Sequence, residues 1–154
     1  MKLDMTAVIF FSFESTIQNK VNSLKEKLEN DRKFISSNNL KINLQTNNEN
    51  TIFDSIKCSN LLVCLLTHKY CQSREHVKLI EYSTRIRKRI VYIILETFEN
   101  EHDMFEIEPL VQESMYVIQC LQNTHENDWT DFDNIKSTLE TILNVNKNYI
   151  KLHI

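Results

Sequence analysis

The stretch Asn60-Leu-Leu-Val-Cys-Leu-Leu-Thr67 decides how the rest of the chain is interpreted. It holds six apolar residues in a row between polar neighbours, with no alternation. Such a run is typical of a strand buried on both faces of a parallel sheet, and it is too short for a buried helix. Residues 7–11 and 90–95 share the pattern. Three buried strands separated by helix-patterned segments predict an α/β fold with this run at its centre.

Length and composition predict one globular domain. The chain has 154 residues, of which 42% are hydrophobic and 25% charged. We expect a single domain over 1–154, with a core at about 6–143 and a tail at 144–154. A net charge of −3 gives no general attraction to nucleic acid or membranes. No apolar run approaches the roughly 20 residues of a spanning helix and the start is unlike a signal peptide, so a cytoplasmic protein is expected.

The absence of glycine excludes several nucleotide-binding classes. A Rossmann fingerprint, a Walker loop and a kinase loop all need glycine, because their backbone approaches phosphate closely or takes positive φ. The cysteines are spread along the chain without the close spacing of a metal site, so no metal is expected and the thiols are expected to be reduced. They are Cys58, Cys64, Cys71 and Cys120.

Hydrophobic periodicity predicts alternating strands and helices. The predicted strands are 6–13, 38–45, the run within 60–67, 90–95 and a weaker 115–119. The predicted helices are 16–29, 51–58, 74–88 and 131–143, with loops at 46–50 and 68–73, an irregular acidic region at 96–111 and a tail from 144. Right-handed crossovers then favour a flavodoxin-like fold, a five-stranded parallel sheet of order 2-1-3-4-5 covered by helices on both faces. Alternation in 38–45 indicates a strand near an edge.

With its strands and helices in this order, the chain resembles a Toll/interleukin-1 receptor (TIR) domain. Phe10-Phe-Ser-Phe13 is similar to the family's first box at the end of the first strand, and Trp129-x-x-Phe132 is similar to the third box. Residues 52–59 and the following buried run are similar to its short helix and central strand. The likeness is good from about 7 to 95 and loose afterwards. It implies a signalling module of innate-immunity type, with other TIR domains, or further copies of the chain itself, as partners.

The loop after the second strand departs from the family pattern. Family members carry Arg-Asp and Pro-Gly there, whereas this chain reads Gln45-Thr-Asn-Asn-Glu-Asn-Thr51. The resemblance assigns this loop to contacts between domains. We expect it to protrude as an exposed loop in which Asn47 or Asn48 supplies the positive φ that Gly would give. The interaction residues are then Thr46, Asn47, Asn48, Glu49 and Asn50.

Some family members cleave NAD with a glutamate in the helix after the central strand, in a pattern close to Ser-x-Trp-Cys-x-x-Glu. Anchored on Ser73, this chain has Leu79 at the glutamate position. A carboxylate there would stabilise positive charge as the glycosidic bond opens, and leucine does not. We therefore expect no catalytic residue and no cofactor. The expected lining of the cleft is Ser12, Phe13, Thr67, Glu75 and Leu79.

The alternative is an NAD glycohydrolase, with NAD as its substrate, that uses Glu75 or a carboxylate in a different register. Glu75 lies four residues before Leu79, on the same helix face and one turn lower. Its ordinary role at a helix start is to complement the helix dipole. The basic run 85–89 is typical of a solvated helix end, with an anionic surface as the less common use. The leading hypothesis is a non-catalytic association module, and a purely structural domain of this fold stays open as a third.

Overall fold

The structure is a computed structural model that describes residues 6–46, 49–99, 104, 106–120 and 129–153. The strands are β1 (Ala7–Ser12), β2 (Leu40–Leu44), β3 (Leu61–Leu66), β4 (Ile90–Ile94) and β5 (Val117–Gln119). The helices are η1 (Ser15–Ile17), α1 (Gln18–Asn30), α2 (Arg32–Asn38), α3 (Glu49–Cys58), α4 (His68–Gln72), α5 (Arg74–Arg85), α6 (Glu108–Glu113) and α7 (Phe132–His153).

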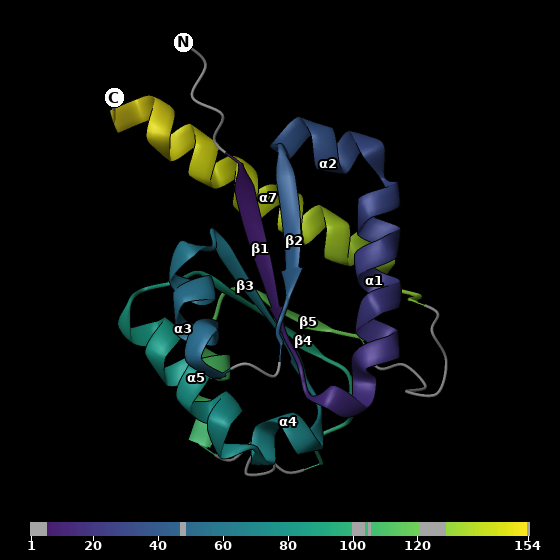
Figure 1. The fold of residues 1–154 in the computed structure, drawn as a ribbon, viewed down its shortest axis with the longest axis vertical. Helices are drawn as coiled ribbons and strands as arrows, with labels where there is room; N and C mark the ends of the chain where they lie inside the picture. The colour runs from purple at the N-terminus through teal and green to yellow at the C-terminus, as the bar shows by residue number, and fades with distance from the viewer. Residues whose placement is uncertain (1–5, 47–48, 100–103, 105, 121–128, 154) are drawn as a thin grey trace.

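The strands form one five-stranded sheet in the order β2-β1-β3-β4-β5, and every neighbouring pair is parallel (Figure 1). The predicted flavodoxin-like order is confirmed, including the edge position of β2. Buried side chains of α1, α2 and α7 pack on one face of the sheet, and those of α3, α4, α5 and α6 pack on the other. Both faces are therefore covered, which is the usual arrangement for a parallel sheet.

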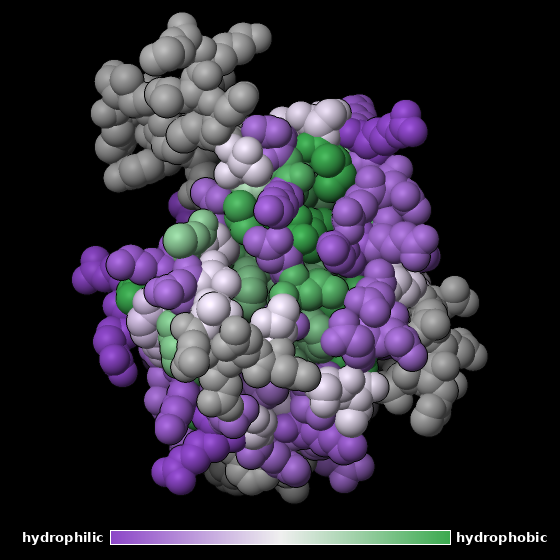
Figure 2. Space-filling view, viewed as in Figure 1, coloured by the Kyte–Doolittle hydropathy of each residue, from purple (hydrophilic) through white to green (hydrophobic). Residues whose placement is uncertain are grey.

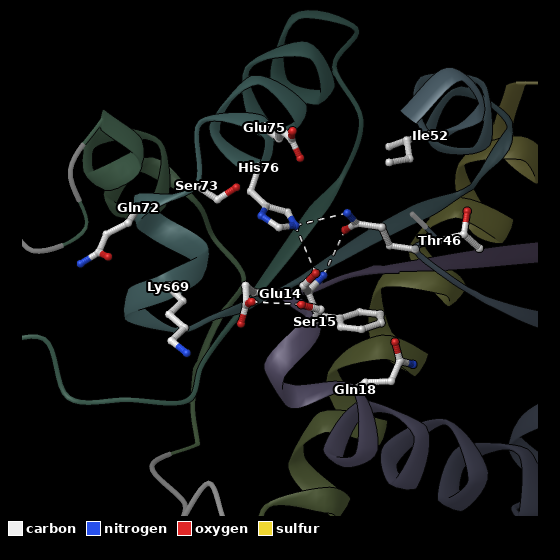
Figure 3. Close-up of a pocket in the computed structure, with 12 residues that line it drawn as sticks. Glu14, Ser15, Gln18, Thr46, Ile52, Lys69, Gln72, Ser73, Glu75 and His76 are labelled. Atoms are coloured by element: carbon white, nitrogen blue, oxygen red, sulfur yellow. Dashed lines mark hydrogen bonds between the residues drawn. The ribbon is translucent and has the colours of Figure 1, made fainter. Parts of the chain in front are cut away.

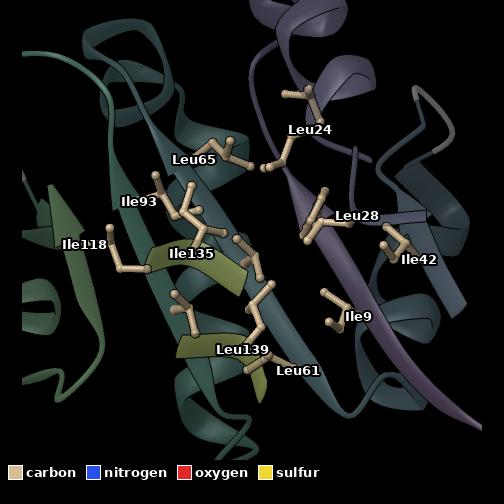
Figure 4. Packing of buried hydrophobic residues seen from close by; sticks show 14 of the residues in the cluster. Ile9, Leu24, Leu28, Ile42, Leu61, Leu65, Ile93, Ile118, Ile135 and Leu139 are labelled. Atoms are coloured by element: carbon tan, nitrogen blue, oxygen red, sulfur yellow. The ribbon is translucent and has the colours of Figure 1, made fainter. Parts of the chain in front are cut away.

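β3 is the centre of the fold, as the opening run predicts. All six of its side chains are 0% exposed. Successive side chains of a strand point to opposite faces, so Leu61 and Leu65 join the layer with α1 and α7, where Leu24 and Leu139 meet them (Figure 4). Val63 joins the same layer, whereas Leu62, Cys64 and Leu66 join the layer on the side of α5. The continuous apolar run thus serves two cores at once.

Trp129 anchors the chain where it enters α7. Its indole Nε1 donates a hydrogen bond of 3.0 Å to the carbonyl oxygen of Lys20 in α1. The ammonium of Lys20 lies 5.1 Å from the centre of the indole ring, a cation–π distance. Two helices distant in sequence are thereby held together on the same face of the sheet.

Two helices lie where none was expected. The expected loop 68–73 contains α4, because Thr67 caps it by accepting a hydrogen bond from the Tyr70 amide at 3.1 Å and Tyr70 packs in the core. α2 follows α1 directly, because Asp31 accepts from the Phe34 amide at 3.0 Å and Phe34 is buried. The expectation of a loop at 68–73 is therefore wrong.

Other differences concern where helices begin and end. α3 begins at Glu49, so the expected loop 46–50 is wrong at Glu49 and Asn50. α6 forms at the end of the region expected to be irregular. α7 continues to His153, so the expected end of the last helix at residue 143 is also wrong. In the described part of the chain, no helix is long and apolar enough to cross a membrane.

Without glycine, other residues take positive φ. Among the described residues these are Asn39, with φ 44°, and Arg87, with φ 59°. Asn39 ends α2, a position that asparagine tolerates well. Arg87 ends α5, where its amide donates to the Thr84 carbonyl at 3.0 Å and the Lys88 amide donates to the Ser83 carbonyl at 2.9 Å. Asn47 and Asn48, for which this role was expected, lie outside the described residues.

Candidate functional site

A cavity of about 580 Å³ opens at the carboxyl edge of the sheet (Figure 3). Three segments build it, each of which follows a strand: the residues after β1, those after β2, and α4 with the first turn of α5 after β3. In open α/β sheets this crevice is where ligands bind. The lining residues are mostly polar. They are Phe13, Glu14, Ser15, Gln18, Gln45, Thr46, Ile52, Lys69, Gln72, Ser73, Glu75 and His76.

A hydrogen-bond network holds the floor of the cavity. The Ser12 hydroxyl donates to Gln45 Oε1 at 2.9 Å, so it accepts from the Tyr70 hydroxyl, 2.8 Å away. Gln45 Oε1 also accepts from the Phe13 amide at 3.3 Å. Ser12 is fully buried and burial raises the pKa of Tyr70, which keeps the phenol protonated as a donor. These groups fix the end of β1 against the residues after β2.

His76 is the buried titratable group of the site. It is 7% exposed and stacks on Tyr70, with 4.2 Å between ring centres. Its Nε2 lies 3.1 Å from the Phe13 carbonyl oxygen and 3.2 Å from Gln45 Nε2 (Figure 3). The Phe13 carbonyl only accepts and the Gln45 amide nitrogen only donates, so Nε2 bonds to Phe13 when it carries the ring proton and to Gln45 when Nδ1 carries it. Burial lowers the pKa of His76, against the opposing effect of the Phe13 hydrogen bond, so the ring is neutral near pH 7.

Of the two carboxylates that line the cavity, Glu14 has a structural role. It caps η1, where its carboxylate accepts from the Thr16 amide at 3.1 Å, from the Thr16 hydroxyl, and from the Ser15 hydroxyl at 3.2 Å. Partial burial raises the pKa of Glu14, but these hydrogen bonds, with a smaller contribution from Lys69, outweigh that effect and lower it. Glu14 is therefore ionised and already engaged near neutral pH.

Glu75, unlike Glu14, has no structural role as a cap. It is an exposed residue in the first turn of α5, on the rim of the cavity. Among the described residues it has neither a hydrogen bond nor an ion pair that would orient it. It is the second carboxylate at the cavity, and its position agrees with a helix N-terminus that favours negative charge.

Leu79 does not line this cavity, and the expectation that it faces the cleft is wrong. Its side chain is 2% exposed and packs with Ile80 and Tyr92 in the layer between α5 and the sheet. The reason is the distance of each turn of α5 from the carboxyl edge of the sheet. Only the first turn of α5 reaches the carboxyl edge, through Ser73, Glu75 and His76, whereas Leu79 lies one turn further under the rim. The identity of residue 79 therefore does not decide which charges the cavity holds.

The other expected lining residues fall into two groups. Phe13 and Glu75 line the cavity, while Ser12 and Thr67 are buried and serve hydrogen bonds inside the fold. Sequence reasoning missed Glu14, Gln45, Lys69, Gln72 and His76 at this site. Each of them directly follows a strand or stands in the helical segments after β3, and that position was the available signal.

The expected interaction loop is only partly described. Thr46 is exposed and contributes to the cavity. Asn47 and Asn48 lie outside the described residues, and Glu49 and Asn50 form the start of α3. The cysteines are free thiols, and among the described residues no group of three or more His, Cys, Asp or Glu is placed to hold a metal ion.

No family model matches the sequence, and no curated protein matches it. Among solved structures, the chain is similar to the TIR domains in the activated Roq1 resistosome, a structure described as directly recognizing the pathogen effector XopQ. The identity is 15% and the TM-score 0.44, over 90% of this chain and 84% of that one. A likeness of this size assigns no activity and no partner to this chain.

Proposed function

We propose that this chain is a cytoplasmic signalling module that acts by associating with other domains of its own kind, and that it catalyses no reaction. The motifs that resemble the TIR family support this. The Phe10–Phe13 motif ends β1 and supplies the hydroxyl of Ser12 to the network under the cavity. Trp129 fixes the start of the last helix. Both motifs therefore have structural roles in a domain of the expected topology.

One observation supports the non-catalytic part of the proposal: neither carboxylate of the cavity is both free to act on a substrate and held in a fixed orientation. Glu14 is engaged as a helix cap. Glu75 is exposed and, within the described part of the chain, has no group to orient it. A catalytic carboxylate is normally held in place by neighbouring hydrogen bonds and packing, because its effect depends on geometry.

The association part is supported by the surface beside the expected interaction loop. β2 is an edge strand, and apolar side chains gather in a band over β1 and β2, between the hydrophilic surfaces of α1 and α3 (Figure 2). A hollow of about 310 Å³ lies there. Its lining includes Phe10, Ile42, Leu44, Thr46 and Ile52. The rest of its lining is polar, namely Lys25, Asn43, Thr51 and Ser55. The hollow therefore presents apolar and polar groups together beside an open sheet edge, which is a suitable contact surface for another domain.

A charge reversal tests this surface. Glu49→Lys should weaken or strengthen self-association in sedimentation velocity while it leaves the melting temperature nearly unchanged. Asp133→Lys is the matched control, since Asp133 is exposed in the first turn of α7, on the other face of the sheet and outside the lining of the hollow. If self-association changes equally with both substitutions, or with neither, the loop region is not part of the interface.

The alternative function, cleavage of NAD with Glu75, has one observation in its favour. Glu75 lies on the rim of a cavity whose volume of about 580 Å³ is in the range of small-molecule sites. The test is to incubate the purified chain with NAD and to measure nicotinamide. We expect no release above buffer. Release that Glu75→Gln abolishes and Glu81→Gln leaves intact would replace our proposal, because Glu81 is exposed on the same helix away from the cavity.

A further inference from the structure

A hollow of about 470 Å³ lies at the amino end of β4, opposite to the carboxyl edge, and we call it the basic groove. The turn from α5 into β4 forms one wall, and the end of α6 with the approach to β5 forms the other. Three cations of that turn line it, namely Arg87, Lys88 and Arg89, together with one carboxylate, Glu113. The groove is therefore a local positive surface on a chain whose net charge is −3.

Two of these cations are used by the fold. The ammonium of Lys88 donates to the carbonyl oxygens of Lys57, at 3.2 Å, and of Ser59, which ties the end of α3 to the start of β4. The guanidinium of Arg89 donates to the Ile142 carbonyl in α7 at 3.3 Å. Lys88 and Arg89 therefore hold the wall of the groove in place.

Arg87 has no such role and is the cation that the groove offers to a partner. Its side chain is exposed, and within the described residues its guanidinium makes neither a hydrogen bond nor an ion pair. Its backbone, with φ 59°, occupies the left-handed region, where glycine would avoid a steric cost. Backbone outliers of this kind gather at binding sites. Arg85, two residues earlier, is exposed and equally unpaired in the described part of the chain.

Apolar side chains protrude beside these cations. Among the described residues, four large apolar side chains are exposed, and three of them belong to this surface: Ile86, Met115 and Val117. Ile86 lies between the two arginines at the end of α5. Met115 lines the groove and is 86% exposed. Val117 pairs in β5 with Tyr92 of β4, which also lines the groove. Exposed apolar side chains that gather in one place mark a contact surface.

This combination fits an anionic lipid bilayer better than it fits a nucleic acid. A bilayer presents negative headgroups at its surface and an apolar layer just beneath them. The guanidinium groups would stay at the headgroups while the apolar side chains enter that layer. A nucleic acid would engage the cations through its phosphates but would leave Ile86 and Met115 in water. The cytoplasmic leaflet of a membrane carries the negative charge that such a surface needs.

We propose that the basic groove binds an anionic lipid surface, with Arg85 and Arg87 at the headgroups and Met115 in the apolar layer beneath. The inference goes beyond the proposed association function and does not depend on it, because one chain carries the whole surface. Each cation close to an anionic bilayer strengthens binding by about fivefold. Salt screens this attraction, so binding should weaken as ionic strength rises.

The first test is co-sedimentation at low salt with vesicles of phosphatidylcholine, either alone or mixed with phosphatidylserine. The unchanged chain should bind only the mixed vesicles. Arg87→Glu should bind them about twentyfold more weakly, because repulsion replaces attraction at that position. Arg74→Glu makes the same change in net charge at the opposite end of α5 and should bind as the unchanged chain does. Glu113→Gln should bind about fivefold more tightly, because the carboxylate of the groove is neutralised.

A fluorescence measurement tests whether Met115 enters the bilayer. The chain has one tryptophan, Trp129, which is buried against Lys20 and does not reach the surface. Met115→Trp adds a second one at the groove, and its emission should shift to shorter wavelength with mixed vesicles. Lipids brominated in their acyl chains should quench it. Asn19→Trp is the control, since Asn19 is exposed near the start of α1 and outside the groove, and its emission should not change.

Several outcomes would overturn the inference. One is equal binding to both kinds of vesicle, or binding by Arg87→Glu that equals that of the unchanged chain. Another is emission from Met115→Trp that mixed vesicles leave unchanged. Binding to duplex DNA in place of vesicles, lost in Arg87→Glu, would make the groove a nucleic-acid site. Thermal melting of each variant should match the unchanged chain within about 2 °C, the effect of a surface substitution, so that unfolding does not explain a loss of binding. A chain that binds vesicles but stays monomeric without them would refute the association proposal alone.

Discussion

Leu79→Ala is the sharpest test of how α5 lies on the sheet. The leucine is 2% exposed in the layer between α5 and the sheet. The substitution removes roughly three methylene-sized groups, at about 0.8 kcal/mol each, and leaves a cavity that adds about 1 kcal/mol. The free energy of unfolding should therefore fall by about 3.5 kcal/mol. A typical domain has about 5–15 kcal/mol, so the variant should still fold.

The measurement is urea denaturation at 25 °C for the unchanged chain, Leu79→Ala and Lys78→Ala. Lys78 is the adjacent exposed residue of the same helix, and its truncation should change the free energy of unfolding by no more than about 0.5 kcal/mol. A loss below about 1 kcal/mol for Leu79→Ala would place that side chain in the open cavity. That result would agree with the placement of residue 79 in the cleft, which the family resemblance implies, and would refute our description of the site.

The remaining predictions concern a tryptophan, a strained turn and a buried histidine. Trp129→Phe should cost about 2 kcal/mol in urea denaturation, because the hydrogen bond to Lys20 and part of the ring's packing are lost. Arg87→Gly should raise the free energy of unfolding in the same measurement by about 0.5 kcal/mol, because the relief of strain is partly offset by a freer unfolded chain. Burial lowers the pKa of His76, so only the unfolded chain takes up this proton as pH falls through about 6.5. Stability should therefore fall from pH 7 toward pH 5, and His76→Gln should flatten that slope.

Much of the fold was predictable because its strongest signals are local. The run 61–66 shows no alternation, and a parallel strand covered on both faces needs none. The alternation around Ile42 indicated the edge strand, and the handedness of crossovers then favoured the order that the structure has. The short helices were harder to predict. α4 has five residues, and its stability comes from the Thr67 cap and the burial of Tyr70 rather than from a periodic pattern.

The site was less predictable, because it depends on how far each turn of α5 lies from the carboxyl edge of the sheet as well as on the alignment to the family motif. A motif places Leu79 in sequence but does not say which turn of α5 reaches the edge of the sheet. The network of Ser12, Gln45, Tyr70 and His76 joins residues up to 64 positions apart, and it forms only once β1, β2 and the helices after β3 are side by side. No local spacing in the sequence encodes such a network.

The most direct test of the central claim is the mass of the unmodified chain in solution. Light scattering at low salt, over a concentration series that spans about two decades, measures it without labels or variants. We expect an average mass that rises steadily above the 18.4 kDa of one chain as concentration increases. A mass that stays at one chain throughout the series would contradict the proposal that this domain works by association.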